Sequence, residues 1–468
     1  MTGSFSTDPV AHQTGSPLGP IGFHRLRWRD LVHECELAAC GVQMEFGSQL
    51  HLQVDRTNAA TGSHNVHKLK ICFGHCMLSP MTGPGSQRAW RLMNRQRVVD
   101  ELIRRGAVTQ ATLARSTGLS PATISNIVRE LSDAGTLAVP LSGPTGRRGR
   151  YVQLSSKLGV VLGIDVGQRH VRVALGSLDY TILAERDHAL PLSHVLEDDL
   201  ELANDLAESL LRDSGLRRDD VLAVGIGLPA PLDLPNRRLA TSPHLPLWGS
   251  DVGTIVVDRF GENAQIDNDA NLGALGEYVW GAAQGVRNAV YIKMSTSVGA
   301  GLIINGEIAH GERGTAGEIG HMTVEENGRA CFCGGRGCLV TVVEASALLD
   351  QVKHMHGADL TVDQMLELAR TGDRACARVL EDAGRRIGVV IGTLCNVLNP
   401  AMVVLGGPII AADGIVLEAA RTAARRHALP FTLEQVEFVP AALGVSAEVH
   451  GAVALAIRAA APAVPLAR

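Results

Sequence analysis

A strand pattern that occurs twice constrains the fold of this chain more than any other feature. In each half, an apolar segment, a tight turn, a second strand, another turn and a third strand follow one another. These segments lie at residues 160–165, 171–175 and 181–184, and again at residues 289–294, 301–304 and 306–309. A helical segment (residues 195–211) and a buried strand (residues 221–227) follow the first set. The pattern indicates an α/β fold, and its recurrence predicts a duplicated domain whose two lobes hold a ligand between them.

The length and composition exclude several classes of protein. At roughly one domain per 150 residues, a chain of 468 residues allows about three domains. With 46% hydrophobic and 19% charged residues, it is neither collagen-like nor wholly disordered. No apolar segment reaches the roughly 18 residues of a membrane span. The first residues are polar and lack the apolar segment of a signal peptide, so we expect a cytoplasmic protein without a membrane partner.

Positive charge is concentrated in one part of an otherwise acidic chain. Residues 88–150 contain eleven arginines and four acidic residues, whereas the whole chain has a net charge of −5. A compact basic segment suggests a nucleic-acid-binding module, although a solvated basic face would give the same charge. Residues 1–87 have balanced charge and little periodicity, and we expect them to be disordered or an over-extended start.

Within the basic segment, three short helices are predicted at the spacing of a helix-turn-helix. Thr109 is placed to cap the second helix, and Ser120 followed by Pro121 is a start signal for the third. These helices alone would also fit a helical hairpin. A strand over residues 137–141, a basic turn with the sequence GPTGRRGR and a return strand over residues 151–154 favour a winged helix-turn-helix.

The third helix and the basic turn carry the side chains that we expect to bind DNA. The helix presents short polar groups and one guanidinium, which suit base edges and phosphates in the major groove. The arginines of the turn suit phosphate or minor-groove contacts. The predicted DNA-binding residues are Thr123, Ser125, Asn126 and Arg129 in the helix, and Arg147, Arg148 and Arg150 in the turn.

Three cysteines, at positions 331, 333 and 338, lie close together in the second half of the chain. Nine cysteines in a chain of this length are too few for a secreted disulfide scaffold. In a protein expected in the cytoplasm, tight clustering indicates a metal site rather than a disulfide. Three reduced, buried cysteines are the alternative.

Several motifs together resemble the ROK family (repressors, open reading frames and sugar kinases). The resemblance extends from about Arg95 to the C-terminus, and the helix-turn-helix in front is similar to that of the repressor branch. It implies the duplicated fold of actin-like ATPases, which is ribonuclease H-like and of the sugar kinase type, for residues 158–468. The motifs are GIDVG at 163–167, GLPAP at 227–231, NDAN at 268–271, GEIGH at 317–321, CFCGGRGC at 331–338, and Asn399-Pro400 with LGG at 405–407.

The resemblance adds a histidine to the cysteine cluster. His321 with Cys331, Cys333 and Cys338 supplies one imidazole and three thiolates, a set that suits a closed, tetrahedral, structural Zn²⁺. The metal would hold together the loop of residues 321–338 and stiffen the neighbouring segment that contains Glu318.

The resemblance also implies a sugar pocket, because carboxylates and amides bind vicinal hydroxyl groups. In the family's kinases, the aspartate of the NDAN motif takes the proton from the sugar hydroxyl, and Asp269 has that position. A helix N-cap is the alternative role for Asp269. The predicted sugar-binding residues are His244, Asn268, Asp269, Glu318 and His321.

Both phosphate loops depart from the kinase pattern. Gln168 and Arg169 replace a glycine and a threonine in the first loop, and Ser295 and Ser297 replace two glycines in the second. A Cβ atom at these places crowds the approach of backbone N–H groups to phosphate. Val340 also stands where the kinases have a sugar-contacting glutamate. We therefore expect no catalytic residue, and only vestigial nucleotide-binding positions at Asp165, Gly167, Gly299, Gly406 and Gly407.

These observations predict a ROK-type transcriptional regulator, most simply a repressor. Residues 88–157 would bind operator DNA, and residues 158–468 would sense a sugar or sugar derivative. A homodimer or homotetramer is expected, because half-sites pair two reading helices. A sugar kinase with an accessory DNA-binding domain is the alternative, with Asp269 as its catalytic base. An adaptor that binds a protein partner is a third class.

Overall fold

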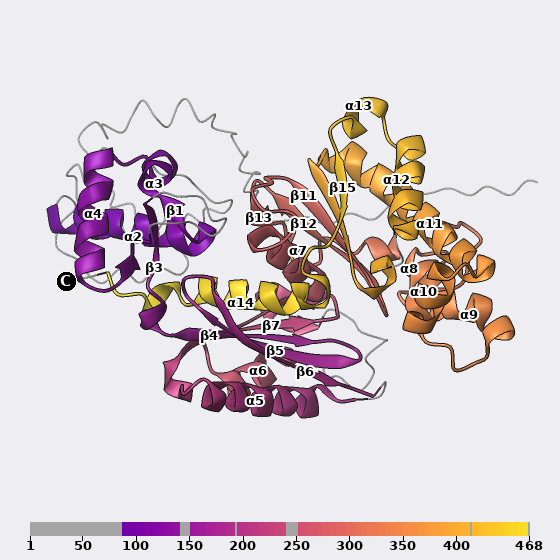
Figure 1. Cartoon of the computed structure of the whole chain (residues 1–468), viewed down its shortest axis with the longest axis horizontal. Helices are drawn as coiled ribbons and strands as arrows, with labels where there is room; N and C mark the ends of the chain where they lie inside the picture. The colour runs from indigo at the N-terminus through magenta and orange to yellow at the C-terminus, as the bar shows by residue number, and fades with distance from the viewer. Residues whose placement is uncertain (1–86, 141–149, 192–193, 240–250, 412–413, 467–468) are drawn as a thin grey trace, which may run out of the picture. The chain divides into compact units, whose positions relative to one another are not determined.

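The structure is a computed structural model, and it describes most of the chain after residue 86. The described residues are 87–140, 150–191, 194–239, 251–411 and 414–466. Within them, three short helices with a small sheet precede two five-stranded sheets (Figure 1). The prediction for residues 1–87 therefore lies outside the described residues, apart from Gln87. Among the described helices, none combines the length and the apolar character needed to cross a membrane.

The first described element group is a winged helix. It consists of α2 (Gln87–Arg105), β1 (Val108–Thr109), α3 (Gln110–Thr117), α4 (Pro121–Asp133), β2 (Leu137–Ala138) and β3 (Tyr151–Leu154). Both predicted caps are confirmed: the hydroxyl of Thr109 accepts from the N–H of Thr112, and that of Ser120 from the N–H of Thr123. Of the strand predicted over residues 137–141, Leu137 and Ala138 form β2 and pair with β3, and the carbonyl of Pro140 accepts from the N–H of Tyr151 (3.1 Å). Residue 141 lies outside the described residues.

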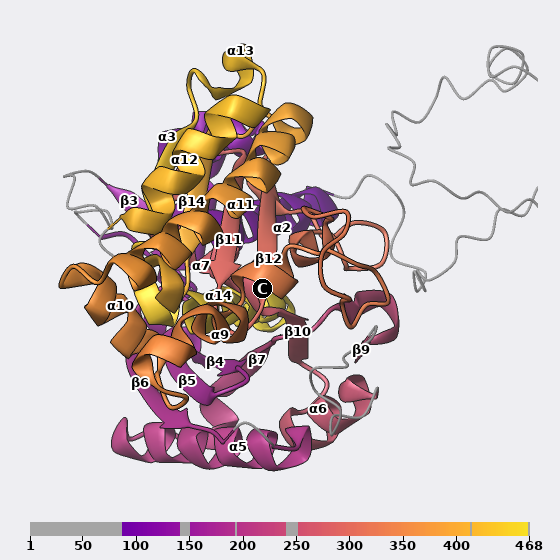
Figure 2. The same cartoon turned by 90° about the vertical axis from the view of Figure 1, so that its right-hand side faces the viewer.

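The first large sheet has the strand order β10-β7-β4-β5-β6. Its strands are β4 (Val160–Val166), β5 (His170–Ser177), β6 (Ile182–Ala189), β7 (Val221–Leu228) and β10 (Ala264–Asn268). β4 pairs antiparallel with β5 and parallel with β7, and β7 pairs parallel with β10. The helices α5 (Leu196–Asp213) and α6 (Val252–Phe260) cover one face of this sheet (Figure 2).

The second large sheet repeats this topology in the order β13-β12-β11-β14-β15. Its strands are β11 (Ala289–Met294), β12 (Val298–Ile304), β13 (Glu307–Ile308), β14 (Met402–Gly406) and β15 (Glu437–Pro440). β11 pairs antiparallel with β12 and parallel with β14, and β14 pairs parallel with β15. In both sheets, the first three strands along the chain pair antiparallel in sequence, and the two later strands add parallel pairings, so the predicted duplication is confirmed.

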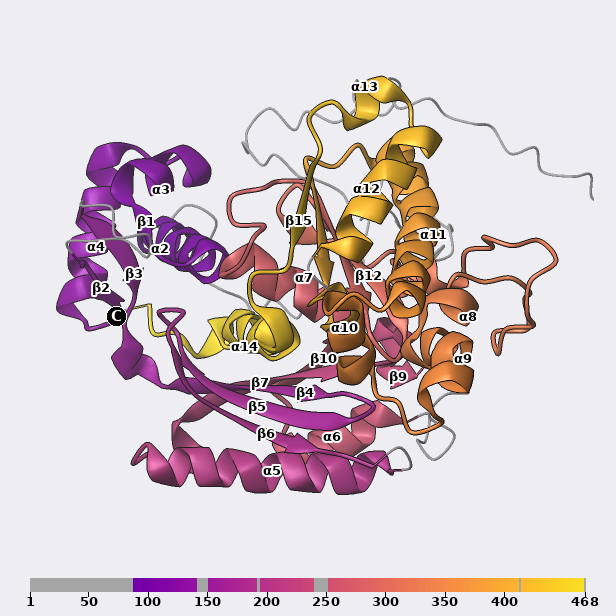
Figure 3. The same ribbon diagram turned by 45° about the vertical axis from the view of Figure 1, so that its right-hand side comes forward.

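Two helices, α7 (Asp269–Val279) and α14 (Ala447–Ala459), pack between the sheets (Figure 3). Their backbones come close to those of their neighbours at several points, beside the apolar side chains that these helices bury. A Cβ atom on Gly225 of β7 would overlap the carbonyl oxygen of Ala452, and one on Gly451 would overlap that of Leu272. Close-packed interfaces of this kind transmit displacement rather than absorb it.

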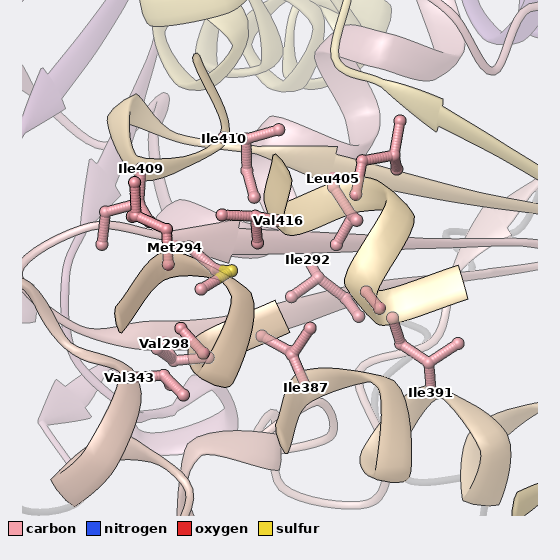
Figure 4. Packing of buried hydrophobic residues seen from close by; sticks show 14 of the residues in the cluster. Ile292, Met294, Val298, Val343, Ile387, Ile391, Leu405, Ile409, Ile410 and Val416 are labelled. Carbon is pink, nitrogen blue, oxygen red and sulfur yellow. The ribbon is translucent and has the colours of Figure 1, made fainter. Parts of the chain in front are cut away.

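The outer face of the second sheet carries the largest apolar core (Figure 4). Helix α11 (Arg374–Leu398) is capped by Asp373 and buries one face against α12 (Ile415–His427) and the sheet. The remaining helices here are α8 (Val340–Val343), α9 (Ala345–His356), α10 (Val362–Arg370) and α13 (Pro430–Leu433). The short elements elsewhere are β8 (Leu232–Asp233), β9 (Arg238–Leu239), η1 (Ser156–Leu158), η2 (Arg218–Asp220), η3 (Leu234–Asn236), η4 (Ile319–His321), η5 (Pro408–Ala411), η6 (Gly444–Ser446) and η7 (Ala461–Ala463).

Candidate functional site

A pocket opens where the ends of β7 and β10 meet the turn between β11 and β12. It encloses about 540 Å³, counting the part open to solvent. The four predicted sugar-binding residues that the structure describes all line it, and they are Asn268, Asp269, Glu318 and His321. Pro229 and Pro231, in the turn after β7, form an apolar wall. A pocket with polar groups on one side and an apolar wall on another fits a small ligand with a C–H face and hydroxyl edges.

Asn268 and Asp269 are positioned by the junction of β10 and α7. The Asn268 side chain accepts from the N–H of Ala270 (2.9 Å) and donates to the carbonyl of Ala230 (3.1 Å), so it caps the helix and ties it to the turn after β7. The alternative in which Asp269 is the N-cap is wrong, since Asn268 has that role. Asp269 is instead the first helical residue, where the helix dipole favours a carboxylate. Its carboxylate is thus left to line the pocket.

Glu318 enters the pocket from the loop that follows β13. The loop approaches β12 closely, since the N–H of Ala300 donates to the carbonyl of Gly317 (2.9 Å). Gly317 has a φ of +97°, and a Cβ atom there would overlap the Ala300 carbonyl, so this position requires glycine. Burial, together with the nearby Asp269 carboxylate, raises the pKa of Glu318 to about 7. Glu318 can therefore donate or accept a hydrogen bond near neutral pH.

The predicted metal ligands come together as a cluster. The ligand atoms of His321, Cys331, Cys333 and Cys338 all lie within 4.8 Å of one another. The His321 Nδ1 atom is 3.6 Å from the Cys331 Sγ atom, and the Sγ atoms of Cys333 and Cys338 are 3.7 Å apart. Tetrahedral Zn²⁺, with Zn–S of about 2.3 Å and Zn–N of about 2.0 Å, requires spacings of about 3.5 Å and about 3.8 Å. The donor set and its spacing thus fit a structural metal ion.

The group of four predicted metal ligands and the pocket share a wall. His321 belongs to the cluster and also lines the pocket. Phe332, between two of the cysteines, lines the pocket as well, and its ring packs edge-on against the His321 imidazole at 5.0 Å. The pocket therefore depends on the conformation of the cysteine loop.

Sequence reasoning missed Lys293 as a pocket residue. It lies in β11, is 9% exposed, and its Nζ atom is 2.9 Å from the Asp269 Oδ2 atom. Burial lowers the pKa of Lys293, but the carboxylates of Asp269, Glu448 and Asp165 outweigh burial and raise it above its ordinary value. A lysine within an otherwise apolar strand was the available signal, because a buried charge requires a partner.

On the nucleotide side of the cleft, the protein's own side chains lie where the resemblance places a phosphate loop. Asp165 is fully buried at the end of β4, and its Oδ2 atom is 2.8 Å from the His170 Nε2 atom. The His170 ring also lies so close to Gly167 that a Cβ atom there would overlap it. Arg172 donates to the carbonyl of Val445 (2.7 Å) beside this pair.

Two of the predicted vestigial glycines are accounted for by packing. A Cβ atom on Gly406 would overlap the Tyr291 hydroxyl, and one on Gly407 would overlap the Met294 carbonyl. A Cβ atom on Gly299 would make a close contact of 3.3 Å with the Cβ atom of Ala270 without overlapping it. Since packing alone accounts for Gly406 and Gly407, these two glycines do not by themselves indicate a nucleotide.

The predicted DNA-reading residues of the helix lie on the outer face of α4. Ser125, Asn126 and Arg129 are exposed, and Thr123 is half-buried beside the Ser120 hydroxyl. The Arg129 guanidinium donates to the Asn126 side chain (3.0 Å). Of the predicted turn residues, Arg150 is exposed. The predicted residues that lie outside the described ranges are Arg147, Arg148 and His244.

A second group of possible ligands has a structural explanation. His356, Asp373 and Cys376 lie within 4.8 Å of one another. The Asp373 carboxylate accepts from the N–H of Cys376 (2.8 Å), caps α11, and lies 3.3 Å from the His356 Nε2 atom. A helix cap with a histidine partner accounts for this group.

Two family models match the chain. One is described as the ROK family and matches residues 161–459, and the other is described as a winged helix-turn-helix DNA-binding model and matches residues 94–137. The chain is 28% identical over 365 residues to a xylose repressor of Bacillus spizizenii, covering 77% of this chain and 93% of that protein. It is also 28% identical over 345 residues to an N-acetylglucosamine repressor of Escherichia coli O157:H7, covering 71% and 84%.

Solved structures are similar over most of their length. A ROK family transcriptional regulator, a homologue of the E. coli MLC protein, has a TM-score of 0.66 at 24% identity, covering 80% of this chain and 98% of that one. A ROK family glucokinase from Streptomyces griseus, in complex with glucose and AMPPNP, has a TM-score of 0.56 at 26% identity, covering 64% and 99%. The predicted fold, a winged helix-turn-helix followed by a duplicated actin-like domain, is confirmed.

Proposed function

Because the chain belongs to the ROK family, we propose that it is a DNA-binding transcriptional repressor that senses a sugar or sugar derivative. One combination of observations carries the proposal. The chain joins a winged helix with an exposed polar face to a pocket lined by Asn268, Asp269, Glu318 and His321. A kinase needs no operator-reading helix, whereas a sugar-responsive repressor needs both parts.

The exposed face of α4 supports operator binding. Asn126 can bond an adenine edge, and Arg129 can bond a guanine edge or a phosphate in the major groove. Arg150, beside the turn that contains Arg147 and Arg148, would contact phosphate or the minor groove. The xylose and N-acetylglucosamine repressors among the relatives support regulation of carbohydrate metabolism.

The pocket supports a sugar as the effector. Asp269 and Glu318 would accept or donate hydrogen bonds at the hydroxyl groups, and Asn268 holds the helix that carries Asp269. His321 would add a polar contact from the metal loop, and Phe332 would lie against a C–H face of the ring. His244 is proposed to complete the pocket.

Zinc is the metal that we propose for the cysteine loop. Three thiolates and one imidazole suit tetrahedral Zn²⁺, and the observed spacings support that geometry. With four protein ligands the site would be closed, so the ion would supply structure rather than a reactive water. Its contribution is to hold His321 and Phe332 in the pocket wall.

An ATP-dependent sugar kinase is the second candidate. The position of Asp269 and the similarity to a ROK glucokinase favour it. Against it, Ser295 and Ser297 replace loop glycines, and His170 lies against Gly167 where a phosphate would approach. We therefore propose that the protein is not an enzyme and that its nucleotide positions are vestigial.

The proposal includes an organisation of the chain. We assign residues 88–157 to the DNA-binding domain, residues 158–468 to the sugar-binding domain, and residues 1–87 to an N-terminal extension. We propose a homodimer or a homotetramer in the cytoplasm, because an inverted-repeat operator pairs two reading helices.

Selection of genomic DNA fragments by the purified protein at near-physiological salt tests the proposal. Salt matters because arginine-driven, sequence-independent binding is strong at low salt. A repressor enriches a few inverted-repeat sites, and the neighbouring genes indicate which sugars to test as effectors. Retention that is insensitive to sequence would overturn operator recognition.

Two variants and a matched control make the selection sharper. Asn126→Ala should cost about 1–3 kcal/mol at one base pair and relax the sequence preference there. Arg150→Ala should weaken binding to all DNA and reduce the dependence on salt. Arg212→Ala removes an exposed arginine from α5, outside the winged helix, and should change neither.

A further inference from the structure

A buried ion cluster joins the pocket to helix α14. The Lys293 Nζ atom lies 2.9 Å from the Asp269 Oδ2 atom and 3.3 Å from the Glu448 Oε1 atom. Asp269 lines the pocket, whereas Glu448 belongs to the first turn of α14 and is 4% exposed. Glu448 also accepts a hydrogen bond from the Tyr291 hydroxyl (3.1 Å), so β11 holds the start of α14 through two side chains. Lys293 is therefore shared between the sugar-binding carboxylate and the helix.

Helix α14 is closely packed along its length. It has 13 residues, which corresponds to a length of about 20 Å. Glycines bring its backbone against both lobes: Gly163 of β4 faces Val449, and Gly276 of α7 faces Ala447. Val449, Val453 and Ile457 of α14 also pack into one apolar core with strand and winged-helix residues. Such close packing transmits a shift at one end of the helix to the other.

The far end of α14 contacts the DNA-binding domain. Ile457 and Ala460 share one apolar core with Val98 and Leu102 of α2. The segment that follows α14 adds two hydrogen bonds: Thr136 donates to the carbonyl of Pro465 (2.9 Å), and Arg95 donates to that of Leu466 (3.1 Å).

An ion bridge reinforces this contact. Glu307, in β13, lies 3.2 Å from the Arg458 guanidinium of α14 and 3.6 Å from the Arg104 guanidinium of α2. Arg104 and Arg105 in turn pair with Glu101 in the same helix. Packing, hydrogen bonds and charge thus all connect the end of α14 to α2.

We propose that Lys293 and Glu448 are positioning residues that report sugar binding to the winged helix through α14. The proposal rests on the proposed function and specifies how the pocket would regulate DNA affinity. A sugar hydroxyl that bonds Asp269 competes with Lys293 for the same carboxylate. The ammonium then shifts toward Glu448, and the displacement of α14 reaches α2 through Ile457 and the Glu307 bridge.

The effector can alter DNA affinity only if it binds two arrangements of the chain with different affinity. The ion cluster supplies two such arrangements, because the Lys293 ammonium can lie closer to the Asp269 carboxylate or closer to the Glu448 carboxylate. Helix shifts of about 1–2 Å at packed interfaces are a known means of switching between states. We call the connection from Lys293 and Glu448 through α14 to the Glu307 bridge the relay. Disrupting it at Glu448 or at Glu307 should reduce the coupling between the sugar and DNA sites without abolishing binding at either site.

The experiment measures operator affinity with and without saturating sugar, by fluorescence anisotropy, in the full-length protein. D-xylose and N-acetyl-D-glucosamine are the first probes, and calorimetry gives the affinity for each sugar separately. The coupling factor is the ratio of the two operator dissociation constants. We expect Glu448→Gln and Glu307→Gln to lower this factor at least fivefold toward 1. The affinity of Glu307→Gln for sugar alone should stay within about threefold of wild type, because Glu307 lies outside the pocket.

Glu418→Gln is the control, since it removes an exposed glutamate that pairs only locally with Arg421 in α12 and should preserve the wild-type factor. If Glu448→Gln does not fold, Glu307→Gln still tests the relay, because its side chain is 47% exposed. Wild-type coupling in folded Glu307→Gln and Glu448→Gln proteins overturns the relay alone. An operator-binding wild type that responds to no sugar overturns the proposed function and the relay with it.

Discussion

The two sides of the central cleft are built on the same strand topology but are used differently. On the sugar side, Asp269, Glu318 and His321 line an open pocket. On the nucleotide side, Asp165 is fully buried and paired with His170, whose ring lies against Gly167. Of the two equivalent turns that the duplication supplies, the one between β11 and β12 presents Ser295 and Ser297 to the pocket, whereas the one after β4 is occupied by the His170 ring. Under the proposed function, the cleft keeps one ligand subsite, and the protein's own side chains fill the place of the other.

Loss of the proposed zinc ion should have the largest effect. In the double variant Cys331→Ser/Cys338→Ser, we expect no zinc to be bound, since the two remaining ligands, His321 and Cys333, are too few for a closed site. The cysteine loop should then release His321 and Phe332, sugar affinity should fall by more than about 100-fold, and stability should fall by several kcal/mol. Metal analysis, calorimetry and thermal unfolding measure these three quantities.

Cys395→Ser provides the control for this prediction, because Cys395 is a buried thiol of α11 outside the cluster. It should retain the metal and the affinity for sugar, even if its melting temperature falls. A double variant that lacks metal but still binds sugar at wild-type affinity would show that the pocket wall does not depend on the loop.

Asp269→Asn should have the second-largest effect. The substitution removes an ionised acceptor that is 13% exposed and leaves Lys293 with Glu448 as its nearest carboxylate. Hydrogen bonds to charged groups contribute about 1.5–3 kcal/mol, so sugar affinity should fall about 10- to 100-fold. Asp363→Asn is a matched control, because Asp363 lies in the first turn of α10 and is exposed outside the pocket. Equal losses of sugar affinity in the two variants would show that the Asp269 carboxylate does not bind the sugar.

Much of the fold could be predicted from local sequence patterns. Caps at Thr109 and Ser120 depend on neighbours two or three residues away, and the strands of both sheets depend on the apolar periodicity. The convergence of Asp269, Glu318 and His321, from three separate segments, required the family's motifs. Spacing alone could not have brought them together.

The remaining features depend on tertiary contacts. A lysine within an apolar strand signals a buried charge, but only packing places Lys293 between Asp269 and Glu448, which are 24 and 155 positions away. The same holds for Gly406, whose need for a small residue comes from the Tyr291 hydroxyl. The pairing of Leu137 and Ala138 with β3 likewise depends on the partner strand, which a local pattern does not specify.

The pair of His310 and Asp267 should produce a smaller effect, on stability. His310 Nε2 lies 2.7 Å from the Asp267 Oδ2 atom, beside the strand end that carries Asn268. The hydrogen bond and charge of Asp267 raise the pKa of His310 above its ordinary value. The stabilisation is therefore complete below the unfolded pKa of about 6.5 and is lost as pH rises through the higher folded value.

The measurement is the unfolding free energy of wild type and His310→Gln at pH 5.5 and pH 8.5. Because the His310 side chain is 36% exposed, solvent screening limits the expected loss to about 0.5 kcal/mol, and it should be present at the lower pH only. His354→Gln, in the last turn of α9, should show no comparable pH-dependent loss. An equal loss at both pH values would assign His310 a packing role instead.

The smallest expected effect is that of ATP, and it tests the other half of the comparison. A nucleotide bound at 100 times its dissociation constant would stabilise the fold by about 2.7 kcal/mol. We expect Mg·ATP to cause no shift in the unfolding transition and sugar to cause no release of ADP. Restoring the loop glycines through Ser295→Gly and Ser297→Gly should not be sufficient, because His170 still lies against Gly167. ATP binding should require His170→Ala in addition to the two glycines. Stabilisation of the wild-type protein by ATP would contradict this prediction and show that the nucleotide side is open.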